Sequence, residues 1–198
     1  MPVTANALVS LLASTLQGSD TKWLQSVLSL EHSFEGWAKF QFAAAIIKKY
    51  GYEPFVRRSD GGYEPGDVGV EYKAKLKRTS KRKQIDLWVS PKKRAHAWHF
   101  LELKVAFGTH FSGAVKNTNT GKQLCSWRDD FLLLQAMDRR GREQKVLSVS
   151  SVLVAVGFKD RAELSARIRA DLGALPARPF ITTVAGAPLF LAHLCKTY

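Results

Sequence analysis

The sequence predicts an α/β fold in which helices flank a mixed β-sheet, and three observations lead to this prediction. Apolar side chains recur at helical spacing over residues 31–50. Short segments with strand-like alternation follow at residues 83–89 and 99–105. A β-rich run, VLSVSSVLVAVG, then occupies residues 146–157 and suits a buried central strand. Because helical and strand patterns alternate along the chain, we expect one sheet covered by helices.

The chain length favours a single domain with an N-terminal helical extension. The extension covers residues 1–30, and one globular unit covers residues 31–198. In the extension, leucines at helical spacing predict a helix over residues 6–17, which Gly18 ends. A second helix is expected over residues 21–30. Neither helix carries recognisable chemistry, so we expect both to cover the core.

The elements of the globular unit begin and end at turn and capping residues. The helix over residues 31–50 ends at Gly51, and Asp160 caps a later helix that Gly173 ends. The other expected elements are, in order, a strand over 52–58, a turn over 59–69, a basic strand-like segment over 71–83, the strand over 83–89, a hairpin loop over 92–95, a strand over 97–105, a loop over 107–119, a helix over 121–137, the strand over 146–157, the helix over 160–172, a strand over 179–184 and a closing helix over 188–197.

The charge of the chain favours a polyanionic partner. Thirty Lys and Arg residues against 17 Asp and Glu residues give a net charge of +13, and the isoelectric point is near 9.9. The 198 residues are otherwise ordinary for a folded domain, with 45% hydrophobic and 24% charged residues. DNA, RNA or an anionic membrane surface would bind such a chain. A ribosome-associated or merely basic protein would carry the same charge.

Several classes of protein are disfavoured by the sequence. No apolar run approaches the roughly 20 residues of a membrane span. A secretory signal begins with a basic region, but no Lys or Arg precedes Lys22 in this sequence. Cys125 and Cys195 are too few for a disulfide scaffold and lack metal-ligand spacing. Reduced thiols are typical of the cytoplasm, where we expect the protein. Neither a phosphate-binding GxxxxGK[ST] loop nor a serine nucleophile elbow occurs in the sequence.

Acidic side chains mark two neighbouring strands. In residues 99–105, alternation places Glu102 and Lys104 on one face and apolar residues on the other. Asp86 lies in the preceding strand with apolar neighbours on both sides. Because a short hairpin joins the two strands, we expect them to pair and to bring these three side chains together.

Two carboxylates on adjacent strands suit a hard divalent cation. Mg²⁺ takes one or two carboxylates and keeps several waters, so Asp86 and Glu102 suffice, with the Leu103 carbonyl as a further ligand. Mg²⁺ would polarise a phosphoryl oxygen and lower the pKa of a bound water, and Mn²⁺ would substitute for it. Lys104 would orient that water or help to deprotonate it, and would offset charge in the transition state. The hypothesis is a metal-dependent phosphodiesterase site.

Basic residues surround Asp86 in the sequence. It is the one acid among ten basic residues between positions 73 and 94. These are Lys73, Lys75, Lys77, Arg78, Lys81, Arg82, Lys83, Lys92, Lys93 and Arg94. Such a run is either a solvated surface or a rim that binds phosphates, and its confinement to one region favours the rim. Aromatic residues interleave with it and could stack on bases, although their strand positions place Trp88 and Trp98 in the core.

With these residues in this order, the chain resembles the PD-(D/E)xK, or restriction-endonuclease-like, nuclease superfamily. The resemblance covers residues 31–157 and rests on Glu35 in a helix, Asp86 in a strand, and Glu102 and Lys104 in the next strand. It implies a core made of a helix, a three-stranded meander, a second helix and a further strand. The proline that precedes the aspartate in the family motif is an isoleucine here, a departure common in the superfamily.

The resemblance also implies roles for these residues. Asp86 and Glu102 would be Mg²⁺ ligands, Lys104 the lysine that activates the water, and Glu35 an accessory acid. Gln123 opens the helix after the motif strand, where some members carry a site residue.

A Mg²⁺-dependent endonuclease is the function that the resemblance implies, with DNA favoured over RNA and a homodimer as a common form. The superfamily also contains members that bind nucleic acid without cutting it. A non-catalytic nucleic-acid-binding or inhibitor protein on the same scaffold therefore remains the alternative. A small interaction protein that uses its charge to bind a nucleoprotein complex is a third interpretation. Defence, mobile-element processing, repair and a delivered toxin are all compatible settings.

Overall fold

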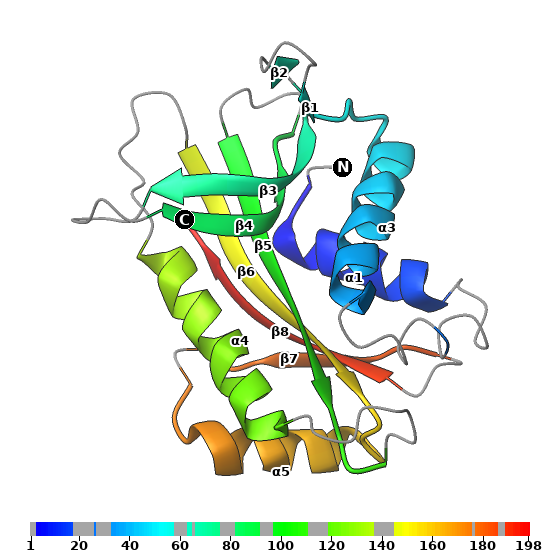
Figure 1. Ribbon diagram of the computed structural model, residues 1–198, viewed down its shortest axis with the longest axis vertical. Coiled ribbons are helices and arrows are strands. Elements are labelled where there is room, and N and C mark those ends of the chain that lie inside the picture. The colour runs from blue at the N-terminus through cyan, green and yellow to red at the C-terminus, as the bar shows by residue number, and fades with distance from the viewer. Residues whose placement is uncertain are drawn as a thin grey trace.

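The protein has a six-stranded mixed sheet with helices on both faces (Figure 1). The structure, a computed structural model, describes residues 3–17, 26, 33–57, 63–64, 66–75, 82–91, 97–110, 119–136, 145–175, 177–185 and 189–198. The helices are α1 (Ala5–Gln17), α3 (Ser33–Tyr50), α4 (Thr120–Gln135) and α5 (Arg161–Leu172). The strands are β1 (Val56–Arg57), β2 (Tyr63–Glu64), β3 (Val68–Lys75), β4 (Arg82–Val89), β5 (Ala97–Phe107), β6 (Lys145–Val156), β7 (Phe180–Thr183) and β8 (Leu189–Thr197).

The order of strands in the sheet is β3-β4-β5-β6-β8-β7, and one neighbouring pair is parallel. β3, β4 and β5 form an antiparallel meander, and β8 pairs antiparallel with both β6 and β7. β5 and β6 are the parallel pair. Parallel neighbours need a crossover connection, and α4 lies between these strands in the chain and packs against both. The short strands β1 and β2 pair with each other outside this sheet.

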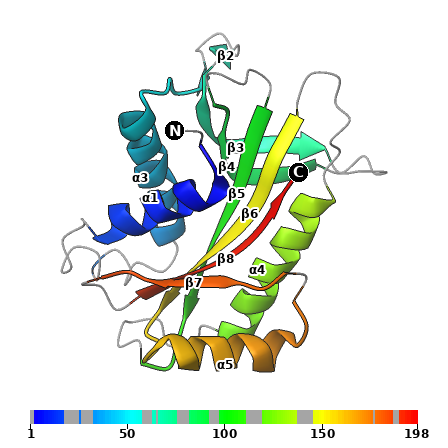
Figure 2. The ribbon, with the colours of Figure 1, turned by 180° about the vertical axis from the view of Figure 1, so that it is seen from behind.

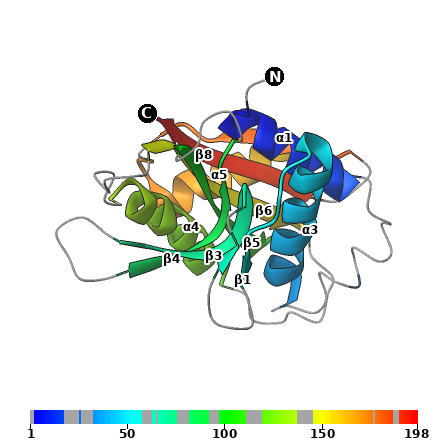
Figure 3. The same ribbon diagram turned by 90° about the horizontal axis from the view of Figure 1, so that it is seen from above.

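Alternation along β6 divides its side chains between two cores, one on each face of the sheet. Val152 and Val154 belong to the core that includes α1 and α3. Val149 and Leu153 belong to the core that includes α4 and α5. Figure 2 and Figure 3 show these two helix pairs on opposite sides of the strands. Because β6 is buried on both faces, apolar side chains occur on both faces of the strand, together with the buried Ser148, Ser150 and Ser151.

Most of the predicted elements in the described parts of the chain are confirmed. The helices predicted over 6–17, 31–50, 121–137 and 160–172 agree within a few residues with α1, α3, α4 and α5. The strands β4 to β7 also lie where they were expected. Asp160 caps α5, because its Oδ1 accepts a hydrogen bond of 2.8 Å from the Glu163 N–H. Gly173 ends this helix with a φ of 60°. The helix expected over 21–30 and the loop over 92–95 lie outside the described residues, apart from Ser26.

The closing helix predicted over residues 188–197 is wrong, because Leu189–Thr197 is strand β8. All six residues from Leu189 to Leu194 are buried, and β8 lies between β6 and β7. A strand covered on both faces is apolar at consecutive positions, so its period-2 pattern disappears. Short apolar runs of this kind do not distinguish a buried strand from a helix by periodicity alone.

Three boundaries between residues 52 and 83 also differ from the prediction. The strand expected over 52–58 is reduced to Val56–Arg57, with an isolated bridge between Pro54 and Val68. The turn expected over 59–69 ends earlier, because β3 begins at Val68. The basic segment over 71–83 belongs to two strands, since β3 ends at Lys75 and β4 begins at Arg82.

None of the helices in the described part of the chain has the length and hydropathy that crossing a bilayer requires.

Candidate active site

The candidate site lies where β4 turns away from β5. The two strands pair over only three residues each, from Leu87 opposite Leu101 to Val89 opposite His99. Beyond Leu101, β5 continues alongside β6 to Phe107. Figure 1 shows β3 and β4 crossing β5 at a steep angle. At the divergence Asp86 Oδ2 accepts a hydrogen bond of 2.8 Å from the Leu103 N–H. This carboxylate therefore replaces the missing strand as the partner of the β5 backbone.

The other oxygen of Asp86 is bound to a lysine that was not among the predicted site residues. Lys39 Nζ of α3 lies 3.0 Å from Asp86 Oδ1 and 3.8 Å from Glu71 Oε1 of β3. The side chains of Lys39 and Asp86 are 14% and 11% exposed. Burial lowers the pKa of Lys39, but the carboxylates of Asp86, Glu35 and Glu71 outweigh it, so the pKa is raised. The sequence signal was the spacing of Glu35 and Lys39, four residues apart on one helix face.

Lys104 lies between two carboxylates from opposite faces of the sheet. Its Nζ is 3.6 Å from Glu35 Oε1 of α3 and 3.3 Å from Asp130 Oδ2 of α4. Burial lowers the pKa of Lys104, but the carboxylates of Glu35, Asp130, Asp86 and Glu102 together raise it. Asp130 was not predicted as a site residue, although it is buried and lies three residues after Trp127 on the apolar face of α4.

Glu35 and Glu102 complete the acidic group. Burial is the largest cause of the raised pKa of Glu35, Lys104 opposes it, and Asp86 adds to it. Glu102 is only 1% exposed and raises the pKa of Lys104 through its charge. The structure therefore brings Glu35, Asp86, Glu102 and Lys104 into one electrostatically coupled cluster.

Leu103 and Gln123 take different places around this cluster. The Leu103 N–H is bound to Asp86, and the N–H and C=O of a strand residue point to the same edge. Its carbonyl is thus directed to the edge on which Asp86 lies. Gln123 instead accepts a hydrogen bond of 3.1 Å from the Phe107 N–H. This fixes the start of α4 to the end of β5, three residues beyond Lys104.

Carboxylate oxygens, as in this cluster, are ligands that a hard cation takes. Among the described residues, no group of three or more His, Cys, Asp and Glu side chains could by itself hold a metal ion. Mg²⁺ needs only one or two carboxylates, however, because it keeps several waters. The Lys39 ammonium already stands beside Asp86 Oδ1 as a positive charge. Asp86 and Glu102 are therefore the residues that could hold a metal at the divergence of β4 and β5.

The predicted phosphate-binding rim is only partly described. Lys73, Lys75, Arg82 and Lys83 lie on the paired ends of β3 and β4, where Lys75 is opposite Arg82. The remaining members lie outside the described residues: Lys77, Arg78, Lys81, Lys92, Lys93 and Arg94. Trp88 is 2% exposed and its ring lies 4.4 Å from that of the half-buried Trp98. The prediction that these two tryptophans belong to the core is confirmed for Trp88, while Trp98 is partly buried and packs against that core.

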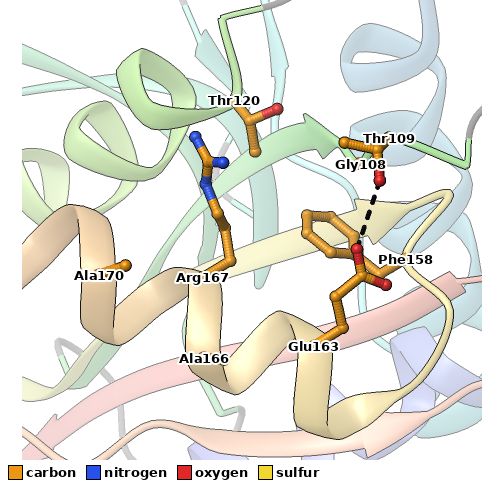
Figure 4. A pocket seen from close by; sticks show the side chains of 8 residues that line it. All are labelled: Gly108, Thr109, Thr120, Phe158, Glu163, Ala166, Arg167 and Ala170. Carbon is orange, nitrogen blue, oxygen red and sulfur yellow. Dashed lines mark hydrogen bonds between the residues drawn. The ribbon is translucent and has the colours of Figure 1, made fainter.

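A separate hollow of about 310 Å³ lies beyond the C-terminal end of β5. It is lined by Gly108, Thr109, Thr120, Phe158, Glu163, Ala166, Arg167 and Ala170 (Figure 4). Its charged groups are bound within the protein: Glu163 accepts hydrogen bonds from Thr109 and from the Lys159 N–H, and Arg167 pairs with Asp171. The acidic cluster on β4 and β5 contributes no residue to this hollow.

Comparisons of the chain with protein-family models, with curated proteins and with solved structures give no significant match.

Proposed function

We propose that this protein is a metal-dependent endonuclease that hydrolyses phosphodiester bonds in DNA, on a restriction-endonuclease-like core. One observation carries the proposal. A helix glutamate, a strand aspartate and the glutamate and lysine of the next strand converge where β4 leaves β5. These are Glu35, Asp86, Glu102 and Lys104, and they share one cluster although residues 35 and 104 are far apart in the chain.

In this proposal each side chain has a distinct task. Asp86 and Glu102 would hold the cation, and Asp86 stays oriented because its Oδ2 accepts a hydrogen bond from the Leu103 N–H. When bound, Mg²⁺ supplies a Lewis acid that polarises a phosphoryl oxygen. Two carboxylates within 3.6 Å favour the ammonium form of Lys104. Lys104 therefore orients the attacking water as a hydrogen-bond donor and offsets negative charge in the transition state, and it does not act as the base.

The setting that we propose follows from charge and cysteine chemistry. A net charge of +13 favours DNA as the partner. Cys125 and Cys195 are free thiols, which is typical of the cytoplasm. Cleavage of both strands of a duplex would be served by a homodimer that presents two such sites.

A non-catalytic DNA-binding protein on the same scaffold is the second candidate. The observation that favours it is the ion pair between Lys39 and Asp86, because an ammonium in contact with Asp86 Oδ1 neutralises that carboxylate without a metal. This protein would bind DNA with a steep salt dependence and would leave it intact.

Incubation of the purified protein with supercoiled plasmid and either Mg²⁺ or Mn²⁺ distinguishes the two candidates. We expect nicked or linear products that disappear with a chelator. Asp86→Asn, which keeps an oxygen for the Leu103 N–H, and Lys104→Met should each lower the cleavage rate by at least about 100-fold. Neither change should weaken DNA binding.

Lys48→Met is the matched control, since Lys48 lies on the exposed C-terminal turn of α3. It removes the same charge and should leave the cleavage rate unchanged. Glu35→Ala should cost about tenfold or less, in keeping with an accessory role. Wild-type protein that binds DNA but cuts no substrate with either metal would exclude the nuclease and leave the binding protein.

A further inference from the structure

Lys39 contacts the one oxygen of Asp86 that the β5 backbone leaves available. Asp86 Oδ2 accepts the Leu103 N–H at 2.8 Å, and Oδ1 lies 3.0 Å from Lys39 Nζ. A Mg²⁺–oxygen distance is about 2.1 Å. An ammonium and a divalent cation on the same oxygen would thus be at most about 5 Å apart, by the sum of the two distances, and would repel each other strongly. Lys39 and a metal therefore compete for Asp86.

Glu71 provides a second anion within reach of Lys39. In β3, Glu71 lies between Val70 and Tyr72, and Asp86 lies between their partners in β4, Leu87 and Ile85. Its Oε1 is 3.8 Å from Lys39 Nζ, and its side chain is 55% exposed. Among the described residues Glu71 is the only non-glycine with a positive φ, 58°. A short movement would transfer the ammonium from the buried carboxylate to the exposed one.

We propose that Lys39 is the resident counter-ion of this site: it neutralises Asp86 until a divalent cation binds, and then pairs with Glu71. The inference rests on the metal site of the proposed function. Without a cation, the charge of Asp86 raises the pKa of Glu35 and that of Lys39 lowers it, so Lys39 offsets the repulsion between the two carboxylates. With a cation bound, Lys39 pairs with the exposed Glu71 instead.

Titration of the DNA-free protein with Mn²⁺ by calorimetry tests this exchange. Lys39→Met keeps the length of the side chain and removes the competing charge, so we expect it to bind Mn²⁺ at least about tenfold more tightly than the wild type. Lys48→Met, on the same helix, should bind Mn²⁺ as the wild type does. A thermal melt in chelator should show a lower Tm for Lys39→Met, and saturating Mn²⁺ should restore it.

Glu71→Gln supplies a second, independent measurement because Glu71 is exposed and has no place in the core. Glu71→Gln should weaken Mn²⁺ binding more when Lys39 is present than in the Lys39→Met background. When Lys39 is present, its ammonium is displaced by the metal and no longer finds the Glu71 carboxylate as an acceptor. Equal Mn²⁺ affinities in wild type and Lys39→Met, or equal effects of Glu71→Gln in both backgrounds, would overturn the exchange but leave the metal site. Absence of Mn²⁺ binding to every variant would instead overturn the metal site of the proposed function.

Discussion

Lys104 shows how a single side chain depends on both faces of the sheet. Glu35 reaches it from α3 and Asp130 reaches it from α4, at 3.6 and 3.3 Å. The position of the lysine is therefore fixed only when both helices are packed against the sheet. A half-buried charge held in this way is costly to leave unpaired, so the loss of either carboxylate should disturb the site more than the loss of a surface ion pair would.

His193 is a buried side chain whose pKa is strongly shifted by its surroundings. It lies in β8, is 3% exposed, and its Nε2 has no hydrogen-bond partner among the described residues. Burial lowers its pKa to about 4. In the sheet it lies opposite Val152 of β6 and Phe180 of β7, neither of which can share a proton.

Because the pKa of His193 is low, we expect the folded protein to lose stability in weak acid. Between pH 6.5 and 4 the unfolded chain binds a proton that folded His193 rejects, so stability falls as the pH falls through this window. The loss should be on the order of 3 kcal/mol, and His193→Leu should remove it. Urea denaturation of both proteins at pH 7 and pH 4.5 measures the difference. Parallel losses in the two proteins would refute the assignment.

The site residues on β4 and β5 were predictable, because the geometry of paired strands determines which side chains share a face and lie close together. Alternation on β5 placed Glu102 and Lys104 on one face, and adjacency of the strands brought Asp86 to them. Lys39 and Asp130 were missed, because their positions in the site depend on how α3 and α4 pack against the sheet. In the sequence, Lys39 reads as a surface lysine, and Asp130 as an interruption of an apolar face.

At the scale of elements, chain order was easier to predict than burial. Helices with one apolar face, such as α4 and α5, show their period and their caps in the sequence. β8 does not, because it is covered on both faces and its alternation is absent. The start of β3 was hidden for a different reason: its Gly69 reads as a turn residue but lies in a strand.

Gly69 is required by the packing of β3 on β4. It pairs with Trp88, and an added Cβ would lie 2.5 Å from the Trp88 Nε1. The Trp88 ring is buried against Trp98 and Phe55 and has no room to move aside. Gly69→Ala should therefore lower the free energy of unfolding by about 1–3 kcal/mol. Chemical denaturation followed by tryptophan fluorescence would measure this change.

Gly36→Ala is the control for this substitution. Gly36 lies in α3, and a Cβ added there meets no atom within 4 Å. The change should stabilise the protein by about 0.5–1 kcal/mol, because alanine favours the helix. If both substitutions had the same sign, the steric explanation for Gly69 would fail.

At the scale of the whole molecule, positive charge is the dominant property. Four basic residues of the predicted rim lie on the paired ends of β3 and β4, while α5 lies at the other end of the molecule (Figure 1). Binding to phosphates releases counter-ions, so DNA affinity should fall steeply as salt is raised.

In the proposed function the paired ends of β3 and β4 bind DNA, and charge reversal on this hairpin tests that binding site. Changing Lys81, Arg82 and Lys83 to Glu should weaken DNA binding and reduce the slope of log affinity against log salt by about one for each phosphate that the variant no longer binds. Fluorescence anisotropy at several salt concentrations measures both quantities. The control changes Lys159, Arg161 and Arg169 to Glu, which alters net charge equally but on exposed positions at or next to α5. Equal slopes in the two triple variants would mean that DNA does not bind at the hairpin.

The position of β8 between β6 and β7 also orders events during synthesis. α1 packs against β6 and β8, so part of the surface that α1 packs against is formed only by residues 189–197. At about 5–20 residues per second, that surface leaves the ribosome roughly ten to thirty-five seconds after α1. In this interval α1 and the exposed edge of β6 are open to other partners, and the nascent protein should depend on chaperones until β8 is in place.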